Sequence, residues 1–296
     1  MMRFPDRVLS DAMRYDLNTN LGNLSTVEQQ LATGKKINSP SDDPVATASV
    51  LRYNTDIALD QQFERTASDA KSRLDAADTA LGSLSDVMQR VRELAVQAGS
   101  GALSATDLSA IGNELNQLVG QAVQIGNTKV GYQYIFAGTK TTTTPFTAVG
   151  GAVPASVTFN GDSNAINVPT GQGTQTQVNV DGNATFMPAL NAIIQIRDAV
   201  NANNAAGIQG SLTTIDNAMD GVLQQRGTIG ATSNGLDALT SRIDAELTTF
   251  QSQRSQLEDS DMADAAVKLN QAQNVYQAAL GAAARVVQST LADFLH

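Results

Sequence analysis

The residue types that carry most enzymatic chemistry are scarce in this chain of 296 residues. It has no cysteine, and its single histidine is the last residue, His296. Thiolate nucleophiles, zinc–thiolate sites and disulfides are therefore excluded, and general acid–base catalysis would have to rely on carboxylates. A histidine at the chain end is typical of a solvated terminus, and we assign it no catalytic role.

Two carboxylate clusters remain as candidates. Asp42 and Asp43 are adjacent in "SPSDDPVA", and Asp259, Asp261 and Asp264 lie close together in "EDSDMAD". Both clusters precede segments with a helical pattern, where carboxylates cap the first turn and interact favourably with the helix dipole. The second cluster lacks the glycine and the distal glutamate of an EF-hand loop, and the chain contains no GxSxG, HExxH or Walker pattern. The sequence therefore predicts no enzyme, no metal site and no cofactor.

Charge and composition exclude further classes of function. The formal net charge is −10, which argues against nucleic acid as a partner because phosphate binding needs a surface rich in Lys and Arg. The N-terminal residues contain no apolar run long enough for a signal peptide, and no stretch reaches transmembrane length. If the protein leaves the cell, we expect export without a cleavable signal peptide.

The strongest pattern is a heptad repeat that recurs in five blocks of the chain. Apolar residues spaced by three and four positions stay on one side of a helix, which is the condition for coiled-coil-like packing. The longest block, from Ile208 to Leu257, predicts a single helix roughly 75 Å long at about 1.5 Å per residue. The first block includes Leu17, Leu24 and Leu31, the last includes Leu269 and Tyr276, and two more cover residues 74–98 and 108–125.

Capping residues indicate where several of these helices begin. Pro44 after Asp43 is typical of a proline at the first helical position behind an aspartate cap. The segment "GSGALSATD" separates the second helix from the third, with Ser104 or Thr106 as the candidate cap. The segment "SDMADAA" places carboxylates in the first turn of the last helix.

Between about residues 131 and 186 the periodicity changes from helical to alternating. The stretch "YQYIF" predicts a strand, with Tyr132, Tyr134 and Phe136 on the buried face of a hairpin. The stretch "SVTFNGDSNAINV" predicts a strand pair that turns at Asn160–Gly161, and a further turn is predicted at Asp181–Gly182.

These patterns predict a mainly helical fold with an inserted β-domain. We expect a long antiparallel helical-bundle rod, with coiled-coil helices at both ends of the chain and a small outer β-domain. The predicted terminal domain comprises residues 1–40 and 259–296. The predicted rod domain comprises residues 41–139 and 188–258 and includes a β-hairpin near residues 130–138. The predicted β-domain comprises residues 140–187.

The two ends of the chain differ in the size of their seam residues. Leu, Met and Val dominate the first seam and alanine dominates the last, so we expect the two terminal helices to pair, with Asn20 fixing their register. The last helix also has a second apolar stripe, and a helix that is apolar on two faces must be buried on two faces. The members of this stripe are Leu280, Ala284, Val287, Leu291 and Phe294.

The second stripe of the last helix therefore needs another molecule to cover it. Packing between subunits is one explanation, and a position in a membrane interface is the other. Because the polar face offers only Lys268 and Arg285 as cations, we favour packing between subunits and expect no membrane partner.

Several segments resemble the bacterial flagellin superfamily. The segment "GKKINSPSDDPVATA" resembles the link between the terminal helix and the rod in flagellins and hook-associated proteins, and "MQRVRELAVQAGSG" resembles the central helical motif of flagellins. The segments "GYQYIFAGTKTTTTPF" and "FNGDSNAINV" and the ending "NQAQNVYQAALGAAARVVQSTLADFLH" are more similar to the hook-associated junction branch of that superfamily than to flagellin itself. The resemblance covers essentially the whole chain.

The resemblance implies a structural adapter of the bacterial flagellum and not an enzyme. Such proteins are exported unfolded through the flagellar type III apparatus, with a cytosolic chaperone on the C-terminal helix, and act outside the cell. Their subunits assemble as a ring on the first hook-associated protein, and flagellin polymerises on that ring. The resemblance also implies a geometric role for the link around Asp43, with Lys35 and Lys36 at the C-terminal end of the preceding helix.

Some alternatives stay open at this point. The stretch "RVRELAVQ" resembles the part of flagellin that toll-like receptor 5 recognises, and its arginines would equally serve as lateral contacts between subunits. The other functions to consider are a flagellin filament subunit, an independent coiled-coil module that captures a partner helix, and an adhesin or hydrolase carried by the β-domain. The predicted assembly residues are Leu17, Leu24, Leu31, Asp43, Arg90, Arg92, Leu269, Tyr276, Leu280, Val287, Leu291 and Phe294.

Overall fold

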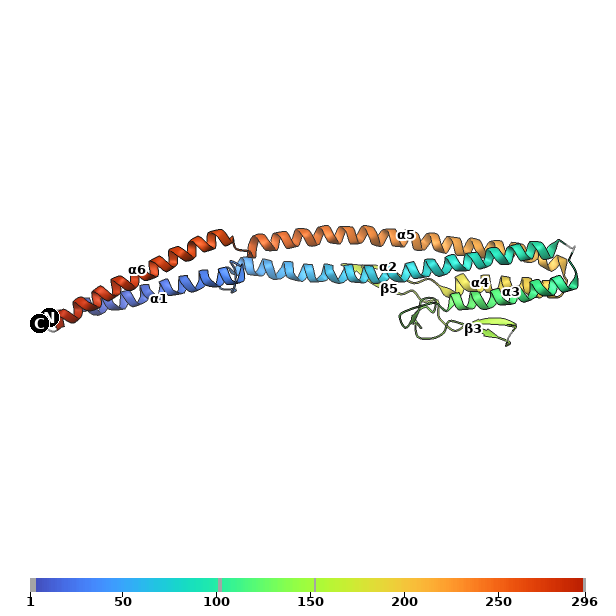
Figure 1. Ribbon diagram of the computed structural model, residues 1–296, viewed down its shortest axis with the longest axis horizontal. Helices are drawn as coiled ribbons and strands as arrows, with labels where there is room; N and C mark the ends of the chain where they lie inside the picture. The colour runs from blue at the N-terminus through green and yellow to red at the C-terminus, as the bar shows by residue number, and fades with distance from the viewer. Residues whose placement is uncertain (1–3, 101–102, 152, 295–296) are drawn as a thin grey trace. The chain divides into compact units, whose positions relative to one another are not determined.

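The computed structural model describes residues 4–100, 103–151 and 153–294, and for residues 4–7, 9 and 286–294 it describes the backbone alone (Figure 1). His296 lies outside the described residues. Long helices make up most of the described chain, as predicted. They are α1 (Phe4–Thr33), α2 (Pro44–Gly99), α3 (Ala105–Gly126), α4 (Gly182–Asn201), α5 (Ala205–Glu258) and α6 (Met262–Phe294).

The chain divides into two compact units. Unit 1 comprises residues 1–59 and 246–296 and holds α1, α6, the first part of α2 and the last part of α5. Unit 2 comprises residues 60–245 and holds the remaining parts of α2 and α5, together with α3, α4 and the described strands. The three-domain division that the sequence suggests stays a prediction.

The core of unit 2 is built from the heptad positions of its helices. Every seam residue of the block from 74 to 98 is buried in α2, and Leu81, Leu84 and Met88 are completely shielded from solvent. Helices α3 and α4 pack against each other and contribute to the same core. The large buried side chains of α5 in this unit recur every seven positions: Ile208, Ile215, Val222, Ile229, Leu236 and Ile243. The smaller Ser211 and Ala218 are buried between them. The heptad interpretation is therefore confirmed.

Ion pairs between α2 and α5 accompany this packing in unit 2. The pairs are Lys71 with Asp237, Asp78 with Arg226, and Arg92 with Asp216. Their order along the two helices is antiparallel, and the cation comes from α2 in two pairs and from α5 in the third. Each pair is partly exposed, so solvent screens the two charges and we ascribe to the set a role in register more than in stability.

The strands form two-stranded antiparallel pairs. Strand β1 (Lys129–Val130) pairs with β2 (Gln133–Tyr134), β3 (Phe146–Val149) with β4 (Ser156–Phe159), and β5 (Asn167–Gly171) with β6 (Thr174–Gln177). An inserted β-region between helices is therefore confirmed, although its pairing differs from the prediction.

The turn predicted at Asn160–Gly161 is wrong. Strand β4 pairs backwards with β3, and the residues after Gly161 do not form its partner strand. A Cβ atom at Gly161 would lie 2.5 Å from the ring of Phe159 and 2.8 Å from the carbonyl of Ala137. This glycine is therefore needed for a close approach of the backbone to Phe159 and Ala137, and not for a hairpin turn.

The turn predicted at Asp181–Gly182 is also wrong. Asp181 is the N-cap of α4, and its carboxylate accepts hydrogen bonds from the amides of Asn183 (2.9 Å) and Ala184 (3.2 Å). An aspartate serves a helix start as well as a hairpin, because its short polar side chain reaches nearby backbone amides. Glycine follows it here because a Cβ atom at Gly182 would clash with the carbonyl oxygen of Phe136.

The predicted buried face of Tyr132, Tyr134 and Phe136 is wrong at its first member. Tyr132 is 96% exposed at the tip of the β1–β2 turn, where Gly131 adopts a left-handed φ of 60°. Tyr134 is half-buried, and both Ile135 and Phe136 are buried. The strand ends after Tyr134, so the alternation on which the prediction depended stops there.

A cluster of phenylalanine rings packs the β-region against α4. The ring centroids of Phe136 and Phe186 are 4.6 Å apart, and those of Phe146 and Phe186 are 5.2 Å apart. Phe159 joins the cluster 5.3 Å from Phe146. The side chain of Asn127 accepts from the amide of Phe146 (2.9 Å) and donates to its carbonyl (2.8 Å), which aligns β3 with the end of α3.

Asp162, the only charged residue between Thr141 and Val180, joins two loops of the β-region. Its carboxylate accepts hydrogen bonds from the amide (2.8 Å) and the hydroxyl (2.6 Å) of Thr139 and from the amide of Asn164 (3.1 Å). The hydrogen bonds from Thr139 lower the pKa of Asp162. The carboxylate therefore has a structural role.

Arg197 in α4 is a buried cation that the sequence analysis did not single out. Its guanidinium donates to the carbonyl of Pro154 (2.5 Å), to the side chain of Asn116 (3.3 Å) and to the carboxylate of Asp198 (2.7 Å). These partners connect α4 with α3 and with the loop before β4. A buried charge is tolerated here because its donors are satisfied.

Candidate assembly surface and the joint beside it

The terminal helices α1 and α6 pack against each other in unit 1, as predicted (Figure 1). Their contact follows the heptad seams, in which Leu17, Leu24 and Leu31 of α1 are half-buried. On α6, Ala265 is fully buried, whereas Leu269 and Tyr276 are half-buried. Asn20 is also half-buried in the α1 seam. The pair is therefore a two-helix coiled coil whose seam stays partly accessible.

The second apolar stripe of α6 is not covered within the part of the chain that the structure describes. Leu280 is 44% exposed and Ala284 is exposed. Val287, Leu291 and Phe294 continue this stripe along α6, but their side chains lie outside the described residues. The described members confirm that α1 covers one apolar face of α6 and leaves the neighbouring one open.

Other large apolar side chains of the pair are exposed as well. Val267 and Val275 of α6 and Tyr15 of α1 each have more than half of their surface accessible. Lys268, one of the cations considered for membrane binding, pairs with Asp264 on its own helix (2.7 Å). Among the described residues, no helix combines the length and apolarity that crossing a membrane requires. The terminal pair therefore presents an apolar surface with few charges.

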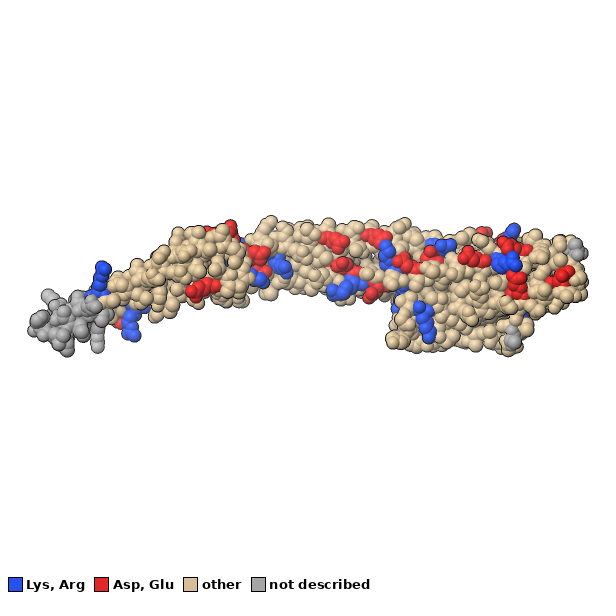
Figure 2. Space-filling view, viewed as in Figure 1, with Lys and Arg blue, Asp and Glu red and all other residues tan. Residues whose placement is uncertain are grey.

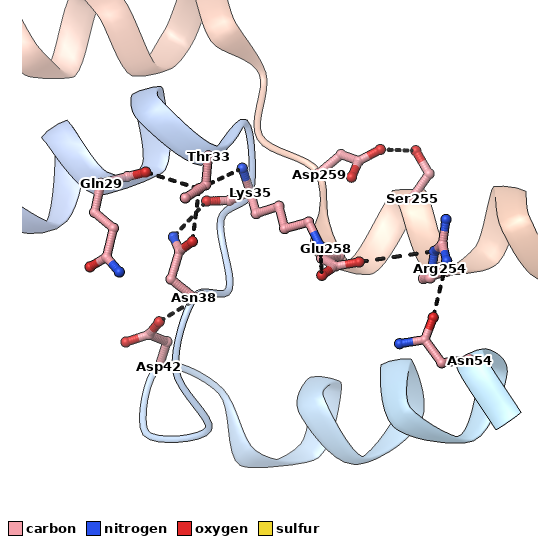
Figure 3. Close-up of polar contacts among 10 residues, drawn as sticks. All are labelled: Gln29, Thr33, Lys35, Asn38, Asp42, Asn54, Arg254, Ser255, Glu258 and Asp259. Atoms are coloured by element: carbon pink, nitrogen blue, oxygen red, sulfur yellow. Dashed lines mark hydrogen bonds and ion pairs between the residues drawn. The ribbon is translucent and has the colours of Figure 1, made fainter.

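Two links connect the terminal helices to α2 and α5. The first link is residues 34–43 between α1 and α2, and the second is residues 259–261 between α5 and α6. We call the place where the two links meet the joint (Figure 3). The amide of Lys36 donates to the carbonyl of Glu258 (2.7 Å), and the amide of Ser260 donates to the carbonyl of Gly34 (2.8 Å). These bonds form one antiparallel bridge between links that are more than 200 residues apart in the chain. Gly34 has a φ of 71°, which ends α1 in the left-handed conformation that favours glycine.

Glu258 is the central side chain of the joint. Lys35 Nζ lies 2.5 Å from Glu258 Oε1, and Arg254 Nε lies 4.0 Å from Glu258 Oε2. The side chain of Glu258 is only 13% exposed, and Arg254 also donates to Asn54 of α2 (3.0 Å). Figure 3 shows Lys35 reaching across from its link to this carboxylate.

Lys35 and Lys36 act on a different helix end from the one predicted. The resemblance places them at the C-terminal end of α1, which the structure ends at Thr33 just before them. Their side chains instead reach the end of α5, where Lys36 Nζ donates to the carbonyl of Gln256 (2.7 Å). The electrostatic reason is the one expected, since a cation is favoured beside helix C-terminal carbonyls, but the helix is the distant one.

The carboxylate clusters of the sequence have structural partners at the joint. Asp43 caps α2 by accepting from the amides of Val45 (3.1 Å) and Ala46 (2.9 Å), as predicted. Asp42 accepts from the amides of Asn38 (2.9 Å) and Ser39 (2.8 Å) and so shapes the link. Both aspartates therefore organise backbone, which is the non-catalytic interpretation.

The second carboxylate cluster behaves in the same way. Asp261 caps α6 by accepting from the amides of Ala263 (2.9 Å) and Asp264 (3.3 Å). Asp259 accepts from the hydroxyl of Ser255 (2.5 Å). Across the residues that the structure describes, His, Cys, Asp and Glu do not gather into a group able to hold a metal ion.

Arg90 and Arg92, the other predicted assembly residues, have partners within the chain. Arg90 contacts Glu114 of α3 (2.7 Å) and Glu93 (3.0 Å), and Arg92 contacts Asp216 of α5 (2.7 Å). Hydrogen bonds to these acids raise the pKa of both guanidinium groups. About half of each arginine side chain stays exposed, so a contact with another molecule is sterically open while both charges already have partners.

Charge is sparse on the face shown in Figure 2, where most of the surface is uncharged. This agrees with a charged content of 16%.

Comparison with known families identifies helical regions at both ends of the chain. The model for the bacterial flagellin N-terminal helical region matches residues 6–141, and the model for the bacterial flagellin C-terminal helical region matches residues 212–295. Together these two regions cover most of the chain, and the part between them contains β3 to β6 and α4.

Individual relatives agree with the family models. The chain is 26% identical to flagellar hook-associated protein 3 of Escherichia coli K12 over 81% of this chain and 83% of that protein. It is 29% identical to flagellin FlaB2 of Treponema pallidum over 92% of this chain and 91% of that protein. The fold is similar to that of a flagellar hook-associated protein from Vibrio parahaemolyticus, with a TM-score of 0.67 and 23% identity over 74% of this chain and all of that one.

Proposed function

Because this chain belongs to the bacterial flagellin family, whose members are structural components of the flagellum, we propose that it is the adapter between hook and filament. Its subunits self-assemble into a ring on the first hook-associated protein, and flagellin polymerises on that ring. The fold serves this role by providing helices that pair within one chain and pack again between chains. Catalysis has no part in the proposal.

The observation that carries the proposal is the exposed apolar surface of α6. The seam of this helix is covered by α1, and the neighbouring stripe that begins at Leu280 is open among the described residues. Exposed apolar surface of this extent on a helix is typical of a contact with another molecule. A second copy of the same pair offers a matching surface, which is the simplest way to bury it.

A filament subunit is the second candidate, because flagellin FlaB2 aligns over more of this chain, and at slightly higher identity, than hook-associated protein 3 of Escherichia coli. The segments "GYQYIFAGTKTTTTPF" and "STLADFLH" favour the adapter. An adapter stops growing after a ring and a flagellin does not, so the two candidates differ in an observable property.

The remaining parts of the proposal concern export and location. We infer that the chain passes unfolded through the flagellar export apparatus, with a chaperone on α6, and functions outside the cell. The same exposed stripe that we assign to assembly gives a chaperone its apolar contact before export. Neither nucleic acid nor membrane is a partner in this proposal.

Seeded assembly tests the proposed function. Purified protein is added to isolated hooks that carry the first hook-associated protein, and the tips are viewed by electron microscopy. We expect one short ring that stops growing and then accepts flagellin. Long filaments of this protein alone would show that it is a filament subunit, and bare hook tips would contradict both candidates.

A pair of matched variants tests the surface assigned to assembly. Leu280→Asp places a charge on the exposed stripe of α6, and Val153→Asp places one on a similarly exposed position before β4. We expect Leu280→Asp to remain folded by circular dichroism but to form no ring, while Val153→Asp assembles as the wild type does. Normal rings from Leu280→Asp would remove this stripe of α6 from the interface.

A further inference from the structure

The C-terminal end of α5 lacks the stabilisation that helix ends usually have. No basic residue lies in its last turn, Arg254 just before that turn approaches the carboxylate of Glu258 only to 4.0 Å, and the chain places two acids, Glu258 and Asp259, at this end. A carboxylate beside the last carbonyls of a helix opposes the helix dipole. Glu258 is also largely buried, so its carboxylate is costly to leave without a partner.

The stabilising groups come from the link between α1 and α2. Lys35 pairs with the carboxylate of Glu258, and Lys36 donates through its side chain to the carbonyl of Gln256. The backbone amide of Lys36 donates to the carbonyl of Glu258, which is one of the last carbonyls of the helix. Three contacts from two adjacent lysines therefore perform, from a distant part of the chain, what a C-terminal cap performs locally.

The two links also depend on each other. The amide of Ser260, which lies between α5 and α6, donates to the carbonyl of Gly34 at the end of α1. If the first link moves away, the second link loses this acceptor and the end of α5 loses its cap at the same time. Closure of the joint is therefore expected to be cooperative.

We propose that Lys35 and Lys36 form a detachable C-terminal cap for α5, so that the joint opens and closes as one unit. In the closed state the last turn of α5 and both links are ordered. In the open state Glu258 faces the helix carbonyls without Lys35, and the last turn of α5 unwinds together with the links. The terminal pair can then change position without unfolding the rest of α5.

Amide hydrogen exchange of the full chain in its monomeric form tests the proposal independently of assembly. We expect Lys35→Met to accelerate exchange about tenfold at residues 255–260, because the charge-assisted contact between Lys35 and Glu258 is lost. Lys35 is half-exposed, so this substitution leaves the packing intact. The matched control is Lys268→Met, which removes an exposed ion pair on α6 in the same unit and leaves residues 255–260 unchanged.

A second substitution tests whether the unpaired carboxylate of Glu258 is what opens the joint. In the Lys35→Met background, Glu258→Gln removes the charge that opposes the dipole, and we expect exchange at residues 255–260 to slow again by about threefold. Unchanged exchange in Lys35→Met, or a further acceleration on adding Glu258→Gln, would overturn the proposal.

Salt supplies a measurement on the unaltered protein. Raising the salt concentration screens the contact between Lys35 and Glu258, so exchange at residues 255–260 of the wild type should accelerate. Lys35→Met should show little of this dependence, because the screened contact is already missing. Equal salt dependence in both proteins would contradict the detachable cap.

Discussion

The core side chains of unit 1 are less shielded from solvent than those of unit 2, although both cores are built on heptad repeats. In unit 2, the seam of α2 shares one core with α3, α4, α5 and the β-region, and many side chains are completely shielded. In unit 1, the buried apolar side chains among the described residues are Val50, Ile57, Leu247 and Ala265, and only the last belongs to the pair of α1 and α6.

This difference teaches that a heptad repeat specifies a face and not a depth of burial. Two helices alone cover only the seam between them, whereas additional elements are needed to bury the flanks. Unit 2 obtains these elements from its own chain. The terminal pair lacks them within the described residues, and we propose that assembly supplies them.

The largest effect is expected from a cavity in the deeper core. Leu84→Ala removes a completely buried side chain of unit 2 and should lower the free energy of unfolding by about 3 kcal/mol. Urea unfolding followed by circular dichroism measures this loss. The control is Val96→Ala on the same helix, which is half-exposed and should change it by less than about 0.5 kcal/mol. Similar losses from both would contradict the assigned core.

The next effect concerns the buried cation. Arg197→Met leaves the carbonyl of Pro154 without its guanidinium donor and should lower the free energy of unfolding of unit 2 by about 2 kcal/mol. Arg65→Met on the exposed surface of α2 serves as the control and should have little effect. If Arg197→Met proved as stable as the wild type, the network between α3, α4 and the loop before β4 would contribute no net stability.

A smaller and local effect is expected in the terminal pair. Leu24→Ala removes a half-buried seam residue, which should cost about 1 kcal/mol, and hydrogen exchange in α1 and α6 should accelerate accordingly. The urea midpoint of unit 2 should not move. Leu21→Ala, on the exposed side of the same helix, is the matched control. A shift of the midpoint of unit 2 by Leu24→Ala would show that the two units unfold together.

The smallest effect is expected at Asp162 and only in acid. Because hydrogen bonds from Thr139 lower the pKa of this carboxyl in the folded state below its ordinary value of 3.8, its stabilisation is complete above that value. The stabilisation is lost as the pH falls through the lowered folded-state pKa. Thermal midpoints measured from pH 5 downwards should therefore fall more in the wild type than in Asp162→Asn. Parallel curves would show that the carboxylate does not stabilise the loops.

Much of the helical structure could be predicted because its signals are local. The burial of Leu81, Leu84 and Met88 follows from their spacing, and the cap at Asp43 follows from the proline after it. The same is true of α3, where Ser104 is the N-cap and Asp107 completes a capping box, while Thr106 is not the cap.

The β-region resisted prediction for a physical reason. Its strands are two to five residues long, so alternation is too brief to identify partners. Asn160–Gly161 and Asp181–Gly182 both match hairpin signals, yet one permits close packing beside Phe159 and the other starts α4. Short turn motifs are shared by several local structures, and contacts with distant residues choose among them.

The candidate assembly site shows the same division. Leu280 and the stripe that follows it are recognisable from periodicity, but the exposure of the described members could be known only after α1 was placed against the seam. The partners of Arg90 and Arg92 on α3 and α5 were not predictable, since nothing in the local sequence points to Glu114 or Asp216.

The sequence by itself determined the long helices, their apolar faces, their aspartate and serine caps and the family to which the chain belongs, because each depends on residues within a few turns of one another. Only the tertiary structure decided which strands pair, that Tyr132 is exposed, and that Lys35 and Lys36 serve α5 instead of α1. These outcomes depend on contacts between segments that are far apart in the chain, where the geometry of the whole unit selects among partners that are locally equivalent.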